Sequence, residues 1–132
     1  MDIQQGSLGD CYFLSVLSVL TEKPHRVKKL FVSDQVISEG IFAVKMTKNG
    51  ESVEVIVDDY FPCKNKRPVF SKANGNELWV LILEKAWAKL HGSYDKIIGG
   101  QCHETFRDVT GAPAWEFESS EEDAWHRIYE AD

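Results

Sequence analysis

The sequence predicts an α+β fold, and three observations support this prediction. Residues 11–20 form a nearly continuous apolar segment of helical length. An Asn-Gly pair at 49–50 separates two segments typical of strands, and apolar residues recur at helical spacing over 77–90. A chain of 132 residues has a one-domain length, so these helices and a small antiparallel hairpin are expected to share one core.

The first helix is expected at residues 11–20, which read Cys-Tyr-Phe-Leu-Ser-Val-Leu-Ser-Val-Leu. Periodicity alone does not separate a buried helix from a buried strand, because the segment is apolar on nearly all sides. Asp10 is a preferred N-cap residue and the following Thr-Glu-Lys-Pro is a typical stop, so the length favours a helix. A short second helix is expected from Pro24, which suits a first helical turn, to about Phe31.

Two strands are expected at residues 41–46 and 53–57, on either side of Asn49-Gly50. Asn-Gly between apolar, β-branched segments is the strongest short-range hairpin signal. The basic segment 64–68 is interpreted as a solvated, turn-prone loop and not as a binding patch.

The clearest helical periodicity extends from Glu77 to Leu90, and His91-Gly92 marks its end. Its two tryptophans are interpreted as core residues. Gly99-Gly100 indicates an irregular stretch. A last helix is expected after the capping-box sequence at 119–122.

Composition excludes several classes of function. The net charge of -6 argues against a nucleic-acid or anionic-membrane binder, since both need a positive surface. No segment has the length and apolarity to span a membrane, and the start has no signal-peptide pattern. Three cysteines without close pairing do not form a disulfide framework, so we expect a reducing, cytoplasmic location.

Cys11 is the candidate nucleophile, because the first turn of a helix has unpaired N–H groups and a dipole that stabilise a thiolate. It follows a Gly-x-x-Gly-Asp turn that lets the backbone lie close to a substrate. The side-chain amide of Gln5, six residues earlier, could join the Cys11 N–H in binding an oxyanion. From the residues alone, a buried core thiol is the more common alternative.

Residues 5–15, Gln-Gly-Ser-Leu-Gly-Asp-Cys-Tyr-Phe-Leu-Ser, resemble the active-site signature of the calpain family of papain-like cysteine proteases. The resemblance extends in order from Asp2 to about Pro113, through the segments 57–63, 77–94, 99–100 and 110–113. In detail it is closest to the small-optic-lobes and plant phytocalpain branches. It implies a papain-like N-terminal lobe in which a long buried central helix begins with the nucleophilic cysteine.

The resemblance also implies residue roles. Cys11 would be the nucleophile of a calcium-dependent intracellular endopeptidase acting on proteins or peptides, Gln5 the oxyanion donor, and Gly100 a substrate-cleft residue that lets an extended peptide approach. Asp2 and Glu77 match the family's calcium positions, which are completed by backbone carbonyls upstream of the signature. Since calcium takes six to eight oxygens and that upstream loop is absent, the expected site is incomplete. The alternative for Glu77 is a carboxylate at a helix N-terminus.

The sequence departs from the family pattern at two points. Tyr12 replaces the tryptophan usual after the nucleophile, and no segment after Pro113 matches the histidine and asparagine of the family's second lobe. We therefore expect residues 1–118 to form the nucleophile lobe, residues 119–132 to begin the second one, and the isolated chain to be inactive without that partner lobe. The alternative is a non-catalytic, calpain-like interaction or regulatory module.

Four histidines could in principle replace the missing base: His25, His91, His103 and His126. His103 lies nearest to Gly100 in sequence but is interpreted as an ordinary loop residue, and His91 as a structural residue at a helix end. A zinc site from Cys63, Cys102 and His103 fits no known spacing, and no organic cofactor is expected.

Overall fold

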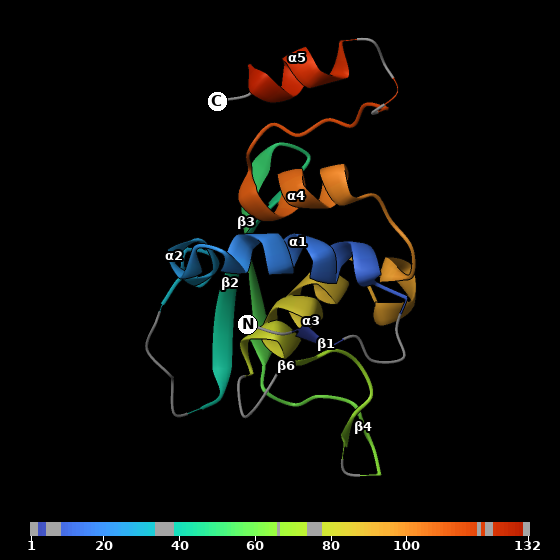
Figure 1. Cartoon of the computed structure of the whole chain (residues 1–132). Helices are drawn as coiled ribbons and strands as arrows, with labels where there is room; N and C mark the ends of the chain where they lie inside the picture. The colour runs from blue at the N-terminus through green and yellow to red at the C-terminus, as the bar shows by residue number, and fades with distance from the viewer. Residues whose placement is uncertain are drawn as a thin grey trace.

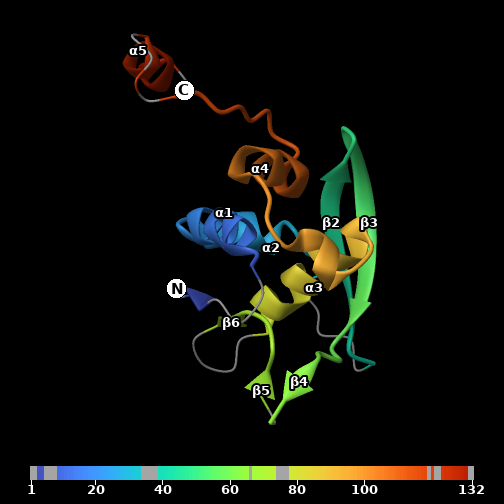
Figure 2. The same ribbon diagram turned by 90° about the vertical axis from the view of Figure 1, so that its right-hand side faces the viewer.

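The computed structural model describes residues 3–4, 9–33, 39–65, 67–73, 78–118, 120 and 123–130, and it has an α+β fold. The strands form three separate antiparallel pairs. The long β2–β3 hairpin stands along one side of helices α1, α3 and α4, while α5 lies at the far end of the molecule from β4 and β5 (Figures 1 and 2). The candidate nucleophile therefore belongs to the helical layer, which the hairpin covers on one side.

Helix α1 (Cys11–Thr21) is the central helix, as predicted, and ends before Pro24. Phe13 and Leu17 are completely buried. Burial of each such side chain stabilises the fold by about 1.5–3 kcal/mol. The exposed side of the helix is formed by Ser15, Ser18 and Val19. Burial thus holds the helix in place along its length. This also fixes the backbone position of Cys11, its first residue.

Helix α3 (Trp79–His91) packs against α1 and is followed by the 3-10 helix η1 (Tyr94–Ile97). The ring of Phe13 stacks on the ring of Trp87 with centroids 5.2 Å apart. The prediction of Trp87 as a core residue is confirmed, since only 3% of it is exposed. The helix begins two residues later than predicted, and Glu77 lies outside the described residues.

The predicted hairpin is confirmed as β2 (Ile41–Lys48) and β3 (Glu51–Asp58), with Lys48 paired to Glu51. Asn49 and Gly50 have φ angles of 53° and 82°, as the turn requires. Val44, Met46, Val55 and Val57 are buried beneath the helices. Helix α2 (Pro24–Lys28) is shorter than predicted, because Phe31 already forms a β-bridge with Val44.

The turn predicted within 64–68 is confirmed at Asn65, but two short strands flank it, so the segment is not a loop throughout. β4 (Cys63–Lys64) and β5 (Arg67–Pro68) pair as a small ribbon. β1 (Ile3–Gln4) pairs with β6 (Lys72–Ala73). This second pair places the segment before α1 beside the segment before α3.

Helix α4 (Cys102–Thr110) was not predicted, and it closes the far side of α1. It ends at Gly111, which has the left-handed φ of 74° typical of a helix C-terminus. Helix α5 (Ala124–Tyr129) begins later than the predicted capping box, of which residues 119, 121 and 122 lie outside the described residues. The boundary predicted between 118 and 119 stays a prediction.

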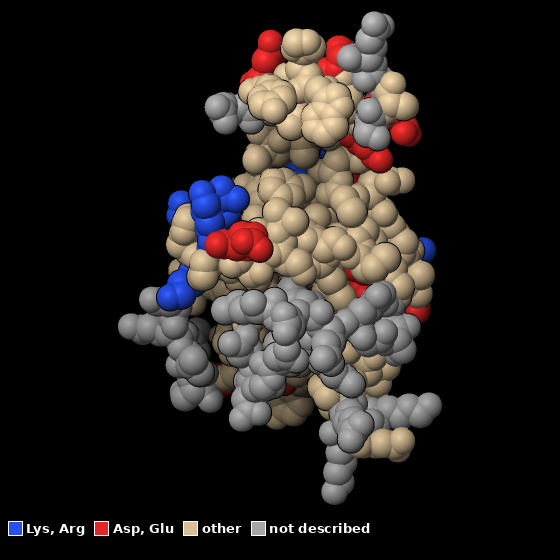
Figure 3. Space-filling model, in the orientation of Figure 1, with Lys and Arg blue, Asp and Glu red and all other residues tan. Residues whose placement is uncertain are grey.

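On the face seen in Figure 3, lysine and arginine side chains gather at α2, and acidic side chains surround α5. The basic residues at the end of α2 include Arg26 and Lys28. Within the described part of the chain, no helix is long and apolar enough to cross a membrane.

Candidate active site

Cys11 is the first residue of α1, and its side chain is exposed. The carbonyl oxygen of Asp10 accepts the first helical bonds, from the N–H groups of Phe13 at 2.9 Å and Leu14 at 3.2 Å. The N–H groups of Cys11 and Tyr12 therefore have no acceptor within the helix. Free N–H groups and the helix dipole favour a thiolate at this position.

The alternative of a buried core thiol is wrong, because Cys11 is open to solvent although the next three residues are buried. Cys63 and Cys102 are also exposed and unpaired, so exposure alone does not distinguish Cys11. Cys102 begins a helix as well, and its thiol lies 3.9 Å from the Tyr12 carbonyl oxygen. Cys11 differs in having an exposed side chain at the head of the central helix, shortly after the bend at Gly9.

A second loop lies against the turn before Cys11. The N–H of Gly99 donates to the carbonyl oxygen of Gly9 at 2.9 Å, which fixes the loop containing Gly100 beside the start of α1. A Cβ on Gly100 would lie 2.6 Å from two ring atoms of Tyr12, Cε2 and Cζ. The structure therefore gives Gly100 a packing role within this chain, besides the substrate-cleft role implied by the resemblance, which stays a prediction.

Tyr12 connects the start of α1 to the elements around it. Its hydroxyl donates to the carbonyl oxygen of Ile97 at 2.9 Å and accepts from Nε1 of Trp87 at 3.2 Å. Burial raises the pKa of Tyr12, and the Trp87 hydrogen bond only partly opposes this. The neutral Tyr12 hydroxyl is thus both a hydrogen-bond donor and a hydrogen-bond acceptor. These two bonds explain structurally why a tyrosine stands at this position.

Two buried carboxyl groups lie beneath the start of α1. Asp10 is 1% exposed and makes no side-chain capping bond to the helix that it precedes. Glu84 on α3 is fully buried and accepts the N–H of Ser71 at 3.2 Å from each carboxyl oxygen. Burial, and then hydrogen bonding to Asp10, raise the pKa of Glu84 to about 8.

The four histidines lie on four different helices. Among the described residues, no hydrogen bond joins any of them to the Cys11 thiol. His91 has the predicted structural role, since its ring contacts Trp87 O and Lys48 Nζ, each at 3.0 Å. His25 and His126 are exposed.

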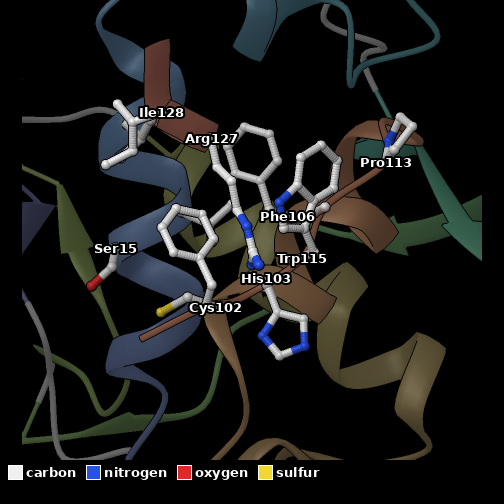
Figure 4. Close-up of a pocket in the computed structure, with 12 residues that line it drawn as sticks. Ser15, Cys102, His103, Phe106, Pro113, Trp115, Arg127 and Ile128 are labelled. Atoms are coloured by element: carbon white, nitrogen blue, oxygen red, sulfur yellow. The ribbon is translucent and has the colours of Figure 1, made fainter. Parts of the chain in front are cut away.

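His103 belongs to helix α4 and not to a loop, which corrects the earlier interpretation. Its Nδ1 lies 2.9 Å from Oε2 of Glu116, an ion-pair distance without hydrogen-bond alignment. His103 lines a groove of about 610 Å³ between α1, α4 and the C-terminal segment (Figure 4). The other lining residues are Ser15, Val16, Val19, Cys102, Phe106, Pro113, Ala114, Trp115, Phe117, Arg127 and Ile128.

Three predicted site residues, Asp2, Gln5 and Glu77, lie outside the described residues, so their roles stay predictions. The β1–β6 pair nevertheless holds Ile3 opposite Ala73, close in sequence to both predicted calcium ligands. Within the ranges that the structure describes, no three His, Cys, Asp or Glu side chains come together as a metal site.

Comparison with known proteins matches the chain to one protein family. The family described as calpain family cysteine protease matches residues 1–131. The chain is 44% identical over 119 residues to the calpain-type cysteine protease DEK1 of Zea mays, which covers 89% of this chain and 6% of that protein. It is 42% identical over 114 residues to calpain-8 of Rattus norvegicus, covering 83% of this chain and 16% of that protein. The chain thus spans a small part of the length of these relatives.

Proposed function

Since the chain belongs to the calpain family of cysteine proteases, we propose that it provides the nucleophile of a calpain-type cysteine endopeptidase that cleaves proteins or peptides in the cytoplasm. The observation that supports this most directly is the exposed Cys11 thiol at the N-terminus of a buried central helix. The three unpaired cysteines support a reducing compartment.

The proposed reaction is acyl transfer. The Cys11 thiolate adds to the carbonyl carbon of a peptide bond, and the oxyanion accepts hydrogen bonds from the Cys11 N–H and the Gln5 side-chain amide. Collapse of this intermediate expels the amine, which takes up a proton, and leaves an acyl-thioester. Water then hydrolyses the thioester and restores the thiol. Gly100 would leave room beside the cleft for an extended substrate.

The general base is proposed to come from a second catalytic lobe. His91 and His103 each contact a partner other than Cys11, and among the described residues no histidine is hydrogen-bonded to the thiol. A chain without the base keeps only the oxyanion and binding contributions, so we propose negligible peptidase activity for the 132 residues alone.

Calcium is proposed as the regulatory ion, with Asp2 and Glu77 as its ligands. Two carboxylates offer four oxygens at most, whereas calcium takes six to eight, so backbone carbonyls and water would have to supply the others. When bound, the ion would align the two lobes. The pairing of Ile3 with Ala73 supports the proposal, because it joins the two segments that bear these residues.

The test is competitive alkylation of the three cysteines by limiting iodoacetamide at pH 7, with each site quantified by peptide mass spectrometry. We expect Cys11 to react at least tenfold faster than exposed Cys63, which is the internal control on a short strand. Equal rates at Cys11 and Cys63 would contradict the assignment of Cys11 as the nucleophile.

The second candidate function, a non-catalytic interaction or regulatory module, is favoured by the absence of a histidine contact to Cys11 among the described residues. Hydrolysis of a fluorogenic peptide distinguishes the protease from the non-catalytic module. It is measured with and without calcium, and with a calpain second lobe added as a separate protein. Turnover that needs the added lobe and is lost in Cys11→Ser supports the protease, whereas a reactive Cys11 without any turnover supports the module. Turnover by the chain alone would contradict the proposal of a missing base.

A further inference from the structure

Asp10 stands at the N-cap of α1, but its side chain does not cap the helix. An aspartate at this position normally accepts an N–H of the first turn, which is worth about 0.5–2 kcal/mol. Here the carboxyl group turns inward, is 1% exposed and makes no capping bond. Neither of its oxygens has a hydrogen-bond donor among the described residues. A group inside the fold must therefore compensate for the missing capping bond and for the burial of the carboxyl group.

The neighbour that compensates is Glu84. Both of its carboxyl oxygens accept the N–H of Ser71, and hydrogen bonding to Ser71 lowers its pKa less than burial and Asp10 raise it. Asp10 raises the pKa of Glu84, after burial, through hydrogen bonding and charge, which indicates that the two buried carboxyl groups face each other. Two ionised carboxylates have only acceptors, so a hydrogen bond between these groups requires a proton on one of them.

Among the side chains that the structure describes, no cation acts on Glu84 and could replace that proton. On α1 the charge of Asp10 acts on Tyr12, and on η1 the pKa of Tyr94 is raised by burial and then by the charge of Glu84. Lys85 is next to Glu84 in sequence, but its ammonium group contacts Asp58 and the carbonyl oxygen of Tyr60. Two buried negative charges without a cation would be strongly unfavourable.

We propose that Asp10 and Glu84 share one proton, and that this carboxyl–carboxylate hydrogen bond positions the start of α1 and thereby the Cys11 thiol. The proton satisfies the otherwise unpaired Asp10, leaves one negative charge on the pair, and ties the residue before the nucleophile to the centre of α3. The inference deepens the proposed function, since the positioning matters for catalysis only if Cys11 is the nucleophile.

The shared proton makes the fold sensitive to pH in a defined direction. The pKa of Glu84 is raised from 4.5 to about 8, so between these values the folded chain binds a proton that the unfolded chain releases. Stability therefore falls as the pH rises from 4.5 to 8. Above pH 8 the pair gains a second charge, which also opposes a thiolate at the neighbouring Cys11.

The first experiment is urea unfolding of the 132-residue chain and of Glu84→Gln between pH 5.5 and 8.5. Glutamine accepts the Ser71 N–H and donates to Asp10 without a titrating proton. Relative to this variant, the unfolding equilibrium constant of the natural chain should fall by up to about tenfold for each pH unit below pH 8. Asp10→Asn should weaken the same dependence, because it removes the neighbouring charge. An identical pH dependence in the natural chain and Glu84→Gln would overturn the shared proton.

The second experiment measures positioning through the alkylation rate of Cys11 relative to Cys63. Above pH 8, we expect this ratio to be several-fold lower in the natural chain than in Glu84→Gln. At pH 7, Glu84→Ala should lower the ratio and Glu84→Gln should retain it. Equal ratios in Glu84→Ala and the natural chain would show that the pair does not position Cys11. If Cys11 is no more reactive than Cys63 in the natural chain, the proposed function fails, while the unfolding experiment still tests the proton.

Discussion

Replacing Gly100 by alanine tests the contact that fixes the loop beside Cys11. The added Cβ would lie 2.6 Å from Cε2 and Cζ of Tyr12 and 3.0 Å from Cδ2. Carbon atoms pack at about 3.5–4.0 Å, so the ring and the loop must separate by about 1 Å. The ring cannot turn away freely, because its hydroxyl is bonded to both Ile97 and Trp87.

The magnitude follows from these contacts. Overpacking a well-packed site costs about 1–3 kcal/mol, and disturbing a buried hydrogen bond adds about 1 kcal/mol. We therefore expect Gly100→Ala to lower the free energy of unfolding by about 2–4 kcal/mol. For a chain of 132 residues this corresponds to a fall in Tm of roughly 6–16 °C.

The assay is thermal unfolding followed by circular dichroism, with Gly9→Ala as the matched control. Among the described residues, a Cβ on Gly9 would meet Cγ2 of Ile98 at 3.4 Å, an ordinary contact in the same pair of loops. We expect the control to change Tm by a few degrees at most. If Gly100→Ala unfolds at the same temperature as Gly9→Ala, the Tyr12 ring is not held as described, and the reasoning fails.

Two further substitutions test the support of α1. Tyr12→Phe removes the hydroxyl that joins Ile97 and Trp87, which leaves two buried partners unsatisfied. We expect the free energy of unfolding, measured in urea, to fall by about 1–3 kcal/mol. An unchanged free energy would mean that water replaces the hydroxyl. Leu17→Ala should cost about 2–5 kcal/mol by calorimetry, since Leu17 is fully buried in the core, and a loss below 1 kcal/mol would contradict close packing there.

The elements that were predicted correctly are those with strong local signals. Helix α1 has a long apolar segment followed by a stop, and the hairpin has Asn49-Gly50 with the required positive φ angles. Helix α4 was missed because its short segment includes β-branched residues and few apolar ones. Its Thr105 and Val109 are buried against other elements, so its stability comes from tertiary packing that local propensity does not show. The two-residue strands have no periodicity to detect.

The candidate site was predictable in part for the same reason. Its candidate nucleophile, Cys11, follows glycine-rich residues and begins a helix, which is a local pattern. The direction of the Asp10 side chain is not local, because a partner 74 positions later competes with the helix cap. One signal was available: Glu84 lies on the same helical face as Val80 and Trp87, where a charged residue is unusual.

The two residues that flank Cys11 explain why its thiol faces solvent at the head of an apolar helix. Asp10 interacts with Glu84, and Tyr12 hydrogen-bonds to Trp87, which lies one turn further along the same face of α3. Both flanking side chains thus point into the fold toward one helix. Successive side chains in a helix differ in direction by about 100°, so anchoring both neighbours inward leaves the residue between them facing outward. The inward direction of the Asp10 and Tyr12 side chains therefore explains the outward direction of the Cys11 side chain.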